Sequence, residues 1–357
     1  MKSLPFFPPR LFEDDRRAIL DIIREVGADP SQEFVAGAGA ARLEDAVRAI
    51  NGARYSFACG SGSAAIAVAL GAMGVGRGDE VIVPAFGCQP VVDSVVNIGA
   101  VPVFADVEPH TFVLDPDAAA AAVGPRTSAL LPAHMFSVMA DMPALRSLAE
   151  GCGLKILEDA ATALGAELNG VPAGRWGDAA VLSFSQFKPL GGIGEGGLVL
   201  TDDPDIARTL PEAHSVGMDE IVARVVLLRL PQLAARLDRK MEIAARYSDA
   251  LRILADKGLL QLPPEAPFGR RFHVYAVLTE ERDHLREHLR RRGVTTHVYY
   301  PVPLPRQPAF TVYAKGAFPH AEAVGRTNLA LPVWPGMTDR DVEYVADAVL
   351  DYFVGRH

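Results

Sequence analysis

The chain has 357 residues, which is long enough for two domains and a large buried core. Hydrophobic residues make up 49% of it and charged residues 22%, the balance of an ordinary globular protein. The formal net charge is −9 and no dense block of Lys and Arg occurs. Because phosphate backbones require clustered positive charge, this excludes an extended nucleic-acid surface but leaves room for a local arginine pocket for one anionic substrate.

Targeting and redox signals are weak. Residues 1–15 lack the uninterrupted apolar core of a signal peptide, and no apolar run reaches the about 18 residues of a membrane span. The three cysteines, Cys59, Cys88 and Cys152, are odd in number and scattered, which indicates a reducing cytoplasm and not a disulfide framework. Neither they nor the nine histidines have the spacing of a metal site, so we expect no metal.

Short apolar strands alternate with helical patterns through the first two thirds of the chain. Strands are predicted at residues 53–58, 80–84, 101–106, 128–134, 154–159, 179–184 and 196–202. Helical patterns lie between several of them, as at residues 64–73 and 142–150. This alternation predicts an α/β fold with a mostly parallel sheet covered on both faces. Ligands of such sheets bind at the carboxyl ends of the strands.

The pattern changes after residue 218. Residues 218–258 could form one long helix, in which Pro231 forces a kink or a break. A smaller α+β section follows. Its expected elements are a strand at 272–279, a helix at 282–292, a strand at 295–300 and a closing helix at 339–353. We therefore predict a large domain of residues 1–240 and a small C-terminal domain of residues 241–357.

One lysine occupies a glycine-rich turn. Lys188 lies in SFSQFKPLGGIGEGG, just past the predicted strand 179–184. Desolvation in such a backbone-dense turn would lower the pKa of the amine and make it a usable nucleophile. Taken alone, this lysine is better explained as a solvated surface residue. The run GGIGEGG is no dinucleotide-binding turn, because it precedes a strand instead of a helix.

A carboxylate ends a second predicted strand. Asp159 is the last residue of LKILED, where it is placed to meet a ligand in the crevice beyond the sheet. The alternative is that it only caps the following turn. Glu158 points to the other face of the strand and is expected to be structural.

Small residues open the helix predicted from residue 64. Ser61-Gly62-Ser63-Ala64 would let backbone N–H groups and the helix dipole bind a phosphate. Ser63 is equally well explained as an ordinary N-cap. Ser183, five residues before Lys188, could add a hydroxyl to the same phosphate.

Seven segments, taken in order, resemble the DegT–StrS family of sugar aminotransferases, and the resemblance covers nearly the whole chain. They are GDEVIVPAF, GAVPVFADVEPHTFVLDP, LPAHMFSVMADM, LEDAATALGA, GDAAVLSFSQFKPLGGIGEGG, HVYYPVPLPRQPAF and LALPVWPGMTDRDV. The resemblance implies the pyridoxal-phosphate-dependent transferase fold type I. This fold has a large, mostly parallel-sheet domain and a small α+β C-terminal domain. It also implies a homodimer with active sites at the interface.

Site residues follow from the resemblance position by position. It implies that Lys188 holds pyridoxal 5′-phosphate as a Schiff base and moves protons, and that Asp159 pairs with the pyridinium nitrogen. A protonated ring nitrogen makes the cofactor an electron sink. The phosphate would be bound by Gly62, Ser63 and Ser183. A lysine at this position argues against the dehydratase branch of the family, which has a histidine there.

Three departures from the family pattern concern the cofactor and the substrate. Thr162 replaces the Gln or His that contacts the phenolic oxygen of the cofactor, and Cys88 replaces the aromatic residue that stacks on its ring, unless Phe86 substitutes. The segment 208–218 is shorter than the family loop, and Ser215 lies nearest the expected Asn of that loop. Part of the usual substrate wall is therefore expected to be missing.

The resemblance implies an aminotransferase with two small-molecule substrates. An amino group would move from glutamate or glutamine to a ketone on a sugar, a cyclitol or another biosynthetic intermediate, through the Schiff base of Lys188. Two alternatives stay open, because the same lysine and aspartate serve them. One is a divergent lyase or substitution enzyme acting on an amino acid, and the other is a non-catalytic, cofactor-binding regulatory relative. We expect a cytoplasmic homodimer that binds neither nucleic acid nor a membrane.

Overall fold

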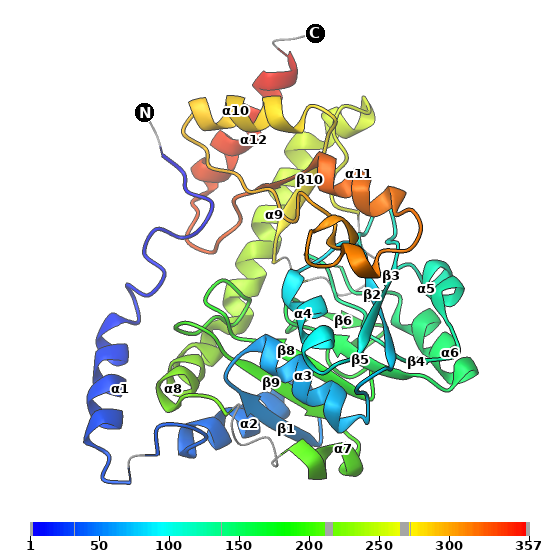
Figure 1. Ribbon diagram of the computed structural model, residues 1–357. Helices are drawn as coiled ribbons and strands as arrows, with labels where there is room; N and C mark the ends of the chain where they lie inside the picture. Colours follow the sequence, from blue (N-terminus) through cyan, green and yellow to red (C-terminus); the bar gives the residue numbers. More distant parts are fainter. Residues whose placement is uncertain are drawn as a thin grey trace.

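A computed structural model describes residues 3–31, 33–136, 138–210, 217–264, 271 and 273–354. Its centre is a seven-stranded sheet with the strand order β1-β9-β8-β5-β4-β2-β3 (Figure 1). The strands of this sheet are β1 (Tyr55–Cys59), β2 (Glu80–Pro84), β3 (Val101–Ala105), β4 (Thr127–Leu130), β5 (Lys155–Asp159), β8 (Ala179–Ser183) and β9 (Gly197–Thr201). Strand β9 runs opposite to the other six strands, so the expected mostly parallel sheet is confirmed.

Helices separate the strands along the chain, as expected for an α/β fold. Those of the sheet-bearing part are α1 (Arg16–Ala28), α2 (Ala38–Asn51), α3 (Gly62–Ala72), α4 (Gln89–Asn97), α5 (Pro116–Ala122), α6 (Met142–Cys152) and α7 (Pro204–Thr209). A short hairpin, β6 (Glu167–Leu168) and β7 (Val171–Pro172), lies between β5 and β8. The strand predicted at 128–134 ends early as β4, because Pro132 has no amide hydrogen with which to continue the ladder.

Both faces of the sheet are buried. Successive residues of β8 alternate between two apolar cores: Ala179 and Val181 belong to one, Ala180 and Leu182 to the other. The first core is completed mainly by α3 to α6 and the second by α2, α8 (Glu220–Arg229) and the start of α9 (Leu233–Asp256). The strands therefore read as continuous apolar runs, as strands of a doubly covered sheet do.

The long helical segment is broken where proline predicted a break. Helix α8 (Glu220–Arg229) leads into a single 3₁₀ turn, η3 (Leu230–Gln232), and then into α9 (Leu233–Asp256). Pro231 lies inside the 3₁₀ turn, because its ring and missing amide hydrogen interrupt an α-helix. Helix α9 then runs through residue 240 without interruption and carries the chain toward the C-terminal elements (Figure 1).

The C-terminal section has its own apolar core. Strands β10 (Tyr275–Leu278) and β11 (Asn328–Leu331) pair antiparallel, and α10 (Arg282–Arg291), α11 (Pro319–Thr327) and α12 (Asp339–Val354) accompany them. Two further 3₁₀ turns are η4 (Leu304–Arg306) and η5 (Thr311–Tyr313). On α9, Leu237 packs with the sheet helices, whereas Ile243 packs in the core of the C-terminal section. The domain boundary near residue 240 stays a prediction.

The strand predicted at residues 295–300 is wrong. Among the residues described, this segment makes one single bridge, between His297 and Ala330, and no ladder, while Val294 just before it bridges to Leu4. Tyr300 has a φ of 50°, which ends the extended conformation. Its ring packs edge-on against Phe86 at a centroid distance of 5.5 Å. Packing of this half-buried tyrosine against the large core therefore overrides the strand pattern.

No helix in the described part of the chain is long and apolar enough to cross a bilayer.

Candidate active site

The predicted site residues come from strand ends and helix starts at one edge of the sheet. Strands β5 and β8 are parallel neighbours, so their last residues, Asp159 and Ser183, lie at the same edge. Both Ser183 and the last residue of β1, Cys59, pair with Gly197 of β9. This pairing brings the start of α3, which follows β1, next to the end of β8.

The start of α3 contacts β8 closely. A Cβ atom on Gly62 would lie 3.1 Å from Cβ and 3.2 Å from Oγ of Ser183, so only glycine fits without displacing the serine. The cap of this helix is Ser61, whose Oγ accepts a hydrogen bond from Ala64 N at 3.1 Å. The alternative of Ser63 as N-cap is therefore wrong, because Ser63 already lies in the first turn. The first amides of a helix have no acceptor within it, which suits them to bind an anion.

Asp159 is a buried carboxylate that uses only part of its hydrogen-bonding capacity among the residues described. Its side chain is 8% exposed, and Oδ1 accepts a hydrogen bond from Ala161 N at 3.0 Å. The residue thus caps the following turn, while its second oxygen accepts no hydrogen bond from the part of the chain described. Burial raises the pKa of Asp159, and the positive charge of Lys188 opposes that rise. A cationic ligand group would stabilise this carboxylate.

The neighbouring carboxylate, Glu158, accepts hydrogen bonds on both of its oxygens. Glu158 accepts hydrogen bonds from the backbone amides of Gly174, at 2.6 Å, and Trp176, at 2.8 Å. Ala140 N donates to His134 Nδ1 at 3.1 Å, so the ring proton lies on Nε2 and is donated to Glu158 at 2.7 Å. With no exposed surface and three donors, Glu158 is structural, as strand alternation predicted.

Lys188 follows β8 in a tight turn. Its amide donates to Ser185 O at 2.8 Å, and Gly192 N donates to Phe184 O at the same distance. A Cβ atom on Gly191 would lie 2.3 Å from the carbonyl oxygen of Gln186, so the turn requires glycine there. Lys188 is half-buried instead of solvated. Burial raises the pKa of both Asp159 and Cys88, and the positive charge of Lys188 opposes that rise in each.

Thr162 and Cys88, the two positions that depart from the family pattern, contact other residues of the protein. Thr162 Oγ1 donates to the carbonyl oxygen of His134 at 2.8 Å. Cys88 precedes α4, is half-buried and lies beside the Tyr300 side chain, and burial raises the pKa of its thiol. Phe86 has no exposed surface and is packed in the core. Tyr300 was missed at the sequence level, because it lies in the segment predicted as a strand.

Ser215 lies outside the described residues, with the rest of segment 211–216.

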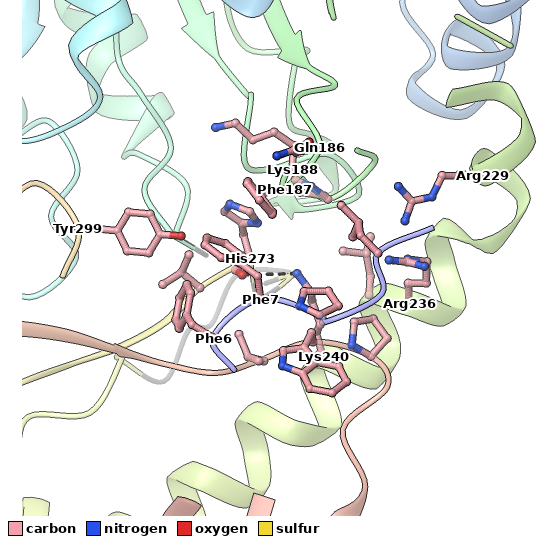
Figure 2. Close-up of a pocket in the computed structure, with 18 residues that line it drawn as sticks. Phe6, Phe7, Gln186, Phe187, Lys188, Arg229, Arg236, Lys240, His273 and Tyr299 are labelled. Atoms are coloured by element: carbon pink, nitrogen blue, oxygen red, sulfur yellow. Dashed lines mark hydrogen bonds between the residues drawn. The ribbon is translucent and has the colours of Figure 1, made fainter. Parts of the chain in front are cut away.

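A pocket adjoins the lysine turn on the side of the N-terminal arm. Figure 2 shows Arg229 and Arg236 pointing into it from the α8–α9 segment, with Lys240 below them and Lys188 at its top. Phe7 of the arm stacks on Phe187 beside Lys188, with ring centroids 4.0 Å apart. The sequence did not indicate this pocket, because its cations come from one helical segment and its walls from the chain terminus.

No cluster of three or more His, Cys, Asp or Glu side chains suited to a metal ion occurs within the described ranges.

Comparison with known proteins agrees with this architecture. Residues 17–350 match the DegT/DnrJ/EryC1/StrS aminotransferase family. A UDP-N-acetyl-3-dehydro-alpha-D-glucosamine 3-aminotransferase of Acidithiobacillus ferrooxidans is 34% identical, with 94% of this chain and 93% of that protein covered. A dTDP-3-amino-3,4,6-trideoxy-alpha-D-glucose transaminase of Streptomyces venezuelae is 38% identical over 84% of this chain and 83% of that one. A protein of Geobacillus stearothermophilus named a pleiotropic regulatory protein is 35% identical, with 96% of both chains covered.

Solved structures of other proteins share this fold. S. venezuelae DesV in complex with a ketimine intermediate superposes with a TM-score of 0.91 at 34% identity, covering 99% of both chains. The Bacillus subtilis protein NtdA, solved with the bound cofactor PMP, has the same TM-score at 28% identity, covering 99% of this chain and 86% of that one.

Proposed function

The chain belongs to the DegT/DnrJ/EryC1/StrS aminotransferase family and is a pyridoxal-phosphate-dependent aminotransferase of fold type I, and from this premise we propose that Lys188 carries the cofactor and Asp159 pairs with its ring nitrogen. One observation carries the proposal: Lys188, Asp159 and the contact of Gly62 with Ser183 meet at one edge of the sheet. That edge is where α/β sheets bind ligands.

The residues at this edge fit the chemistry of the cofactor. A phosphate dianion requires several donors, and the first amides of α3 with the hydroxyls of Ser63 and Ser183 supply them. A pyridinium nitrogen requires a buried carboxylate, and Asp159 has an oxygen left for it. We assign the ring a place between Cys88, the residue before α4, and Thr162, in the turn after β5.

The protein side chains have separate tasks in this proposal. The bound cofactor supplies an electron-accepting ring. Asp159 holds the positive charge on the ring nitrogen, and the Lys188 amine accepts and returns the proton at the substrate carbon. The stacked rings of Phe7 and Phe187 cover one side of the lysine turn. The amino donor is glutamate or glutamine, and a keto-sugar acceptor is supported by relatives named for UDP- and dTDP-linked sugars.

We also propose that the enzyme works as a cytoplasmic homodimer. Leu20 and Ile23 of α1 are 46% and 44% exposed, which is unusual for aliphatic side chains on one helix and suits a partner surface. The three cysteines are all free, in keeping with a reducing compartment. Sedimentation should give twice the 38.1 kDa mass of the chain.

Two alternatives use the same site. A lyase or substitution enzyme would need the same lysine and carboxylate, and product analysis with a keto acceptor separates it from an aminotransferase. A regulatory, non-catalytic role is suggested by the name of the Geobacillus relative. The combination of Lys188 with a spare Asp159 oxygen favours catalysis, because a merely bound cofactor requires no proton-moving amine.

The test is chemical labelling of the lysine. Borohydride reduction of the holoenzyme followed by peptide mapping should place the pyridoxyl group on Lys188, and Lys188→Ala should abolish amine transfer while the fold, measured by circular dichroism, persists. Lys155→Ala is the matched control, because Lys155 pairs with Asp178 on the surface far from the cofactor edge. A pyridoxyl group on another lysine, or amine transfer by the Lys188→Ala enzyme, would refute the assignment.

A further inference from the structure

The main chain of Asp159 is held on both sides by the segment that follows β4. Asp159 N donates a hydrogen bond to the carbonyl oxygen of Pro132 at 2.9 Å, and His134 N donates to the carbonyl oxygen of Asp159 at 3.0 Å. The two bonds form a parallel bridge between Ala133 and Asp159. Residues 132–134 therefore fix the point of the main chain from which the Asp159 carboxylate extends.

The same segment also holds Thr162, the second residue that we place beside the cofactor ring. Thr162 Oγ1 donates to the carbonyl oxygen of His134 at 2.8 Å. The N–H of His134 thus binds Asp159, and its C=O binds Thr162. A shift of His134 would move both proposed cofactor contacts together.

The side chain of His134 is fixed by two buried hydrogen bonds. It is 1% exposed, Nε2 donates to Glu158 Oε1 at 2.7 Å, and Nδ1 accepts from Ala140 N at 3.1 Å. The imidazole cannot rotate without leaving buried polar groups unpaired, which is costly.

The contacts form a closed path through the strand. Glu158 is the residue before Asp159 on β5, and the two side chains lie on opposite faces. The path runs from the Glu158 carboxylate through the imidazole of His134 to the main chain of His134, and from there back to Asp159. Every member of this path is buried.

We propose that His134 is a positioning residue for the reaction: anchored by Glu158, it fixes the main chain from which Asp159 and Thr162 reach the cofactor. This role rests on the proposed pairing of Asp159 with the ring nitrogen. A charged group that is held in place before the ligand arrives binds it without a cost of reorganisation. His134 itself touches neither cofactor nor substrate in this proposal.

The test compares two cofactors that differ at one atom. Absorbance titration of cofactor-free protein measures the affinity for pyridoxal phosphate and for an analogue with a carbon in place of the ring nitrogen. Wild type should prefer pyridoxal phosphate about ten-fold or more, the value of a charged hydrogen bond. His134→Asn, whose shorter side chain does not reach Glu158, should reduce this preference at least about three-fold, because a displaced Asp159 meets the nitrogen less well. A merely structural defect would weaken both cofactors equally and leave the ratio unchanged.

A conservative variant and a matched control complete the comparison. His134→Gln extends an NH₂ donor far enough to reach Glu158 and should retain the preference. In Thr201→Val a buried hydrogen bond to the carbonyl oxygen of Asp178, 2.7 Å long, is lost where β9 pairs with Ala179 at the opposite edge of the sheet. This control should lower the melting temperature and leave the ratio unchanged. An unchanged ratio in His134→Asn, or an equal loss in the Asn and Gln variants, would overturn the proposal.

Hydrogen exchange of the cofactor-free wild-type protein gives a second test that requires no variant. The amides of His134 and Asp159 should exchange about as slowly as those inside β8, because their hydrogen bonds are made entirely by protein groups. Fast exchange that slows only when the cofactor binds would show that the cofactor, and not His134, orders this segment. That result would also overturn the proposal.

Asp159→Asn separates a failure of the positioning role from a failure of the proposed function. If this variant keeps the preference for pyridoxal phosphate, Asp159 does not meet the ring nitrogen and both proposals fail. If Asp159→Asn loses the preference and His134→Asn keeps it, the pairing of Asp159 holds and only the role of His134 is refuted.

Discussion

Glu158 and Asp159 are adjacent carboxylates on β5, but the first has a structural role and the second a proposed chemical role. Side chains alternate along β5, so Glu158 and Asp159 face opposite sides. Glu158 meets three donors from other segments and stabilises the sheet. Asp159 meets one amide and keeps an oxygen available at the strand end. The difference arises from position on the strand, since the two groups are chemically alike.

Replacing Asp159 should affect the reaction more than the fold. Asp159→Asn keeps an oxygen for the Ala161 amide, so the melting temperature should change little. Loss of a charged partner for the ring nitrogen should slow amine transfer by about 10- to 100-fold or more, as each ~1.4 kcal/mol is a factor of ten in rate. Single-turnover rates of the donor half-reaction measure this effect. Near-normal rates would mean that Asp159 serves only to cap its turn.

At the scale of the element, the start of α3 and the break before α9 have the clearest consequences. The first turn of α3 can approach β8 only because Gly62 has no side chain. The 3₁₀ turn at Pro231 redirects the chain between α8 and α9. Arg229 before the break and Arg236 after it therefore line one pocket. The proposed phosphate site therefore depends on the start of α3, and the pocket depends on the start of α9.

Two glycines of α3 allow a matched test. In Gly62→Ala the new Cβ would press on Ser183 at 3.1 Å and disturb the proposed phosphate site. We expect cofactor affinity to fall about ten-fold, at the low end of the cost of overpacking. Gly71→Ala lies on the same helix with nothing within 4 Å of the new atom. It should leave cofactor affinity unchanged and stabilise the fold by about 0.4–1 kcal/mol.

Absorbance titration of cofactor-free protein gives both affinities, and calorimetry gives the stabilities. Equal cofactor affinities in the two glycine variants would argue against a phosphate site at the start of α3.

At the scale of the whole molecule, helix α9 joins two cores. Its first turns pack with the sheet helices through Leu233 and Leu237. Its later turns, from Ile243 onward, pack with β10, β11 and α12 (Figure 1). All proposed cofactor contacts lie in the sheet-bearing part. Cofactor binding should therefore raise the unfolding temperature of the sheet-bearing part more than that of the C-terminal section.

Calorimetric unfolding of holoenzyme and cofactor-free enzyme tests this division. Cofactor at a hundred times its dissociation constant stabilises what it binds by about 2.7 kcal/mol. If residues 1–240 and 241–357 are separate domains, only one of two transitions should shift when the cofactor is removed. A single transition that shifts as a whole would show that α9 couples the cores into one unit and that no boundary lies near residue 240.

Much of the architecture was determined by local sequence patterns. Strand and helix periods predicted the mostly parallel sheet, and the chemistry of proline predicted the break at Pro231. The sequence also predicted Asp159 at the end of a strand and Lys188 in the turn that follows another strand. Strands that run parallel end at the same edge, so residues distant in sequence are brought together by topology alone.

Other features were decided only by tertiary packing. Residues 295–300 have the pattern of a strand, but packing of the half-buried Tyr300 ring against Phe86 turns the chain away. The pocket of Arg236 and Lys240 exists only because the N-terminal arm, with Phe7, folds back over α9 and the lysine turn. Contacts of this kind depend on how elements pack across the molecule. A local period carries no information about them, because it reports which face of an element is buried and not what covers that face.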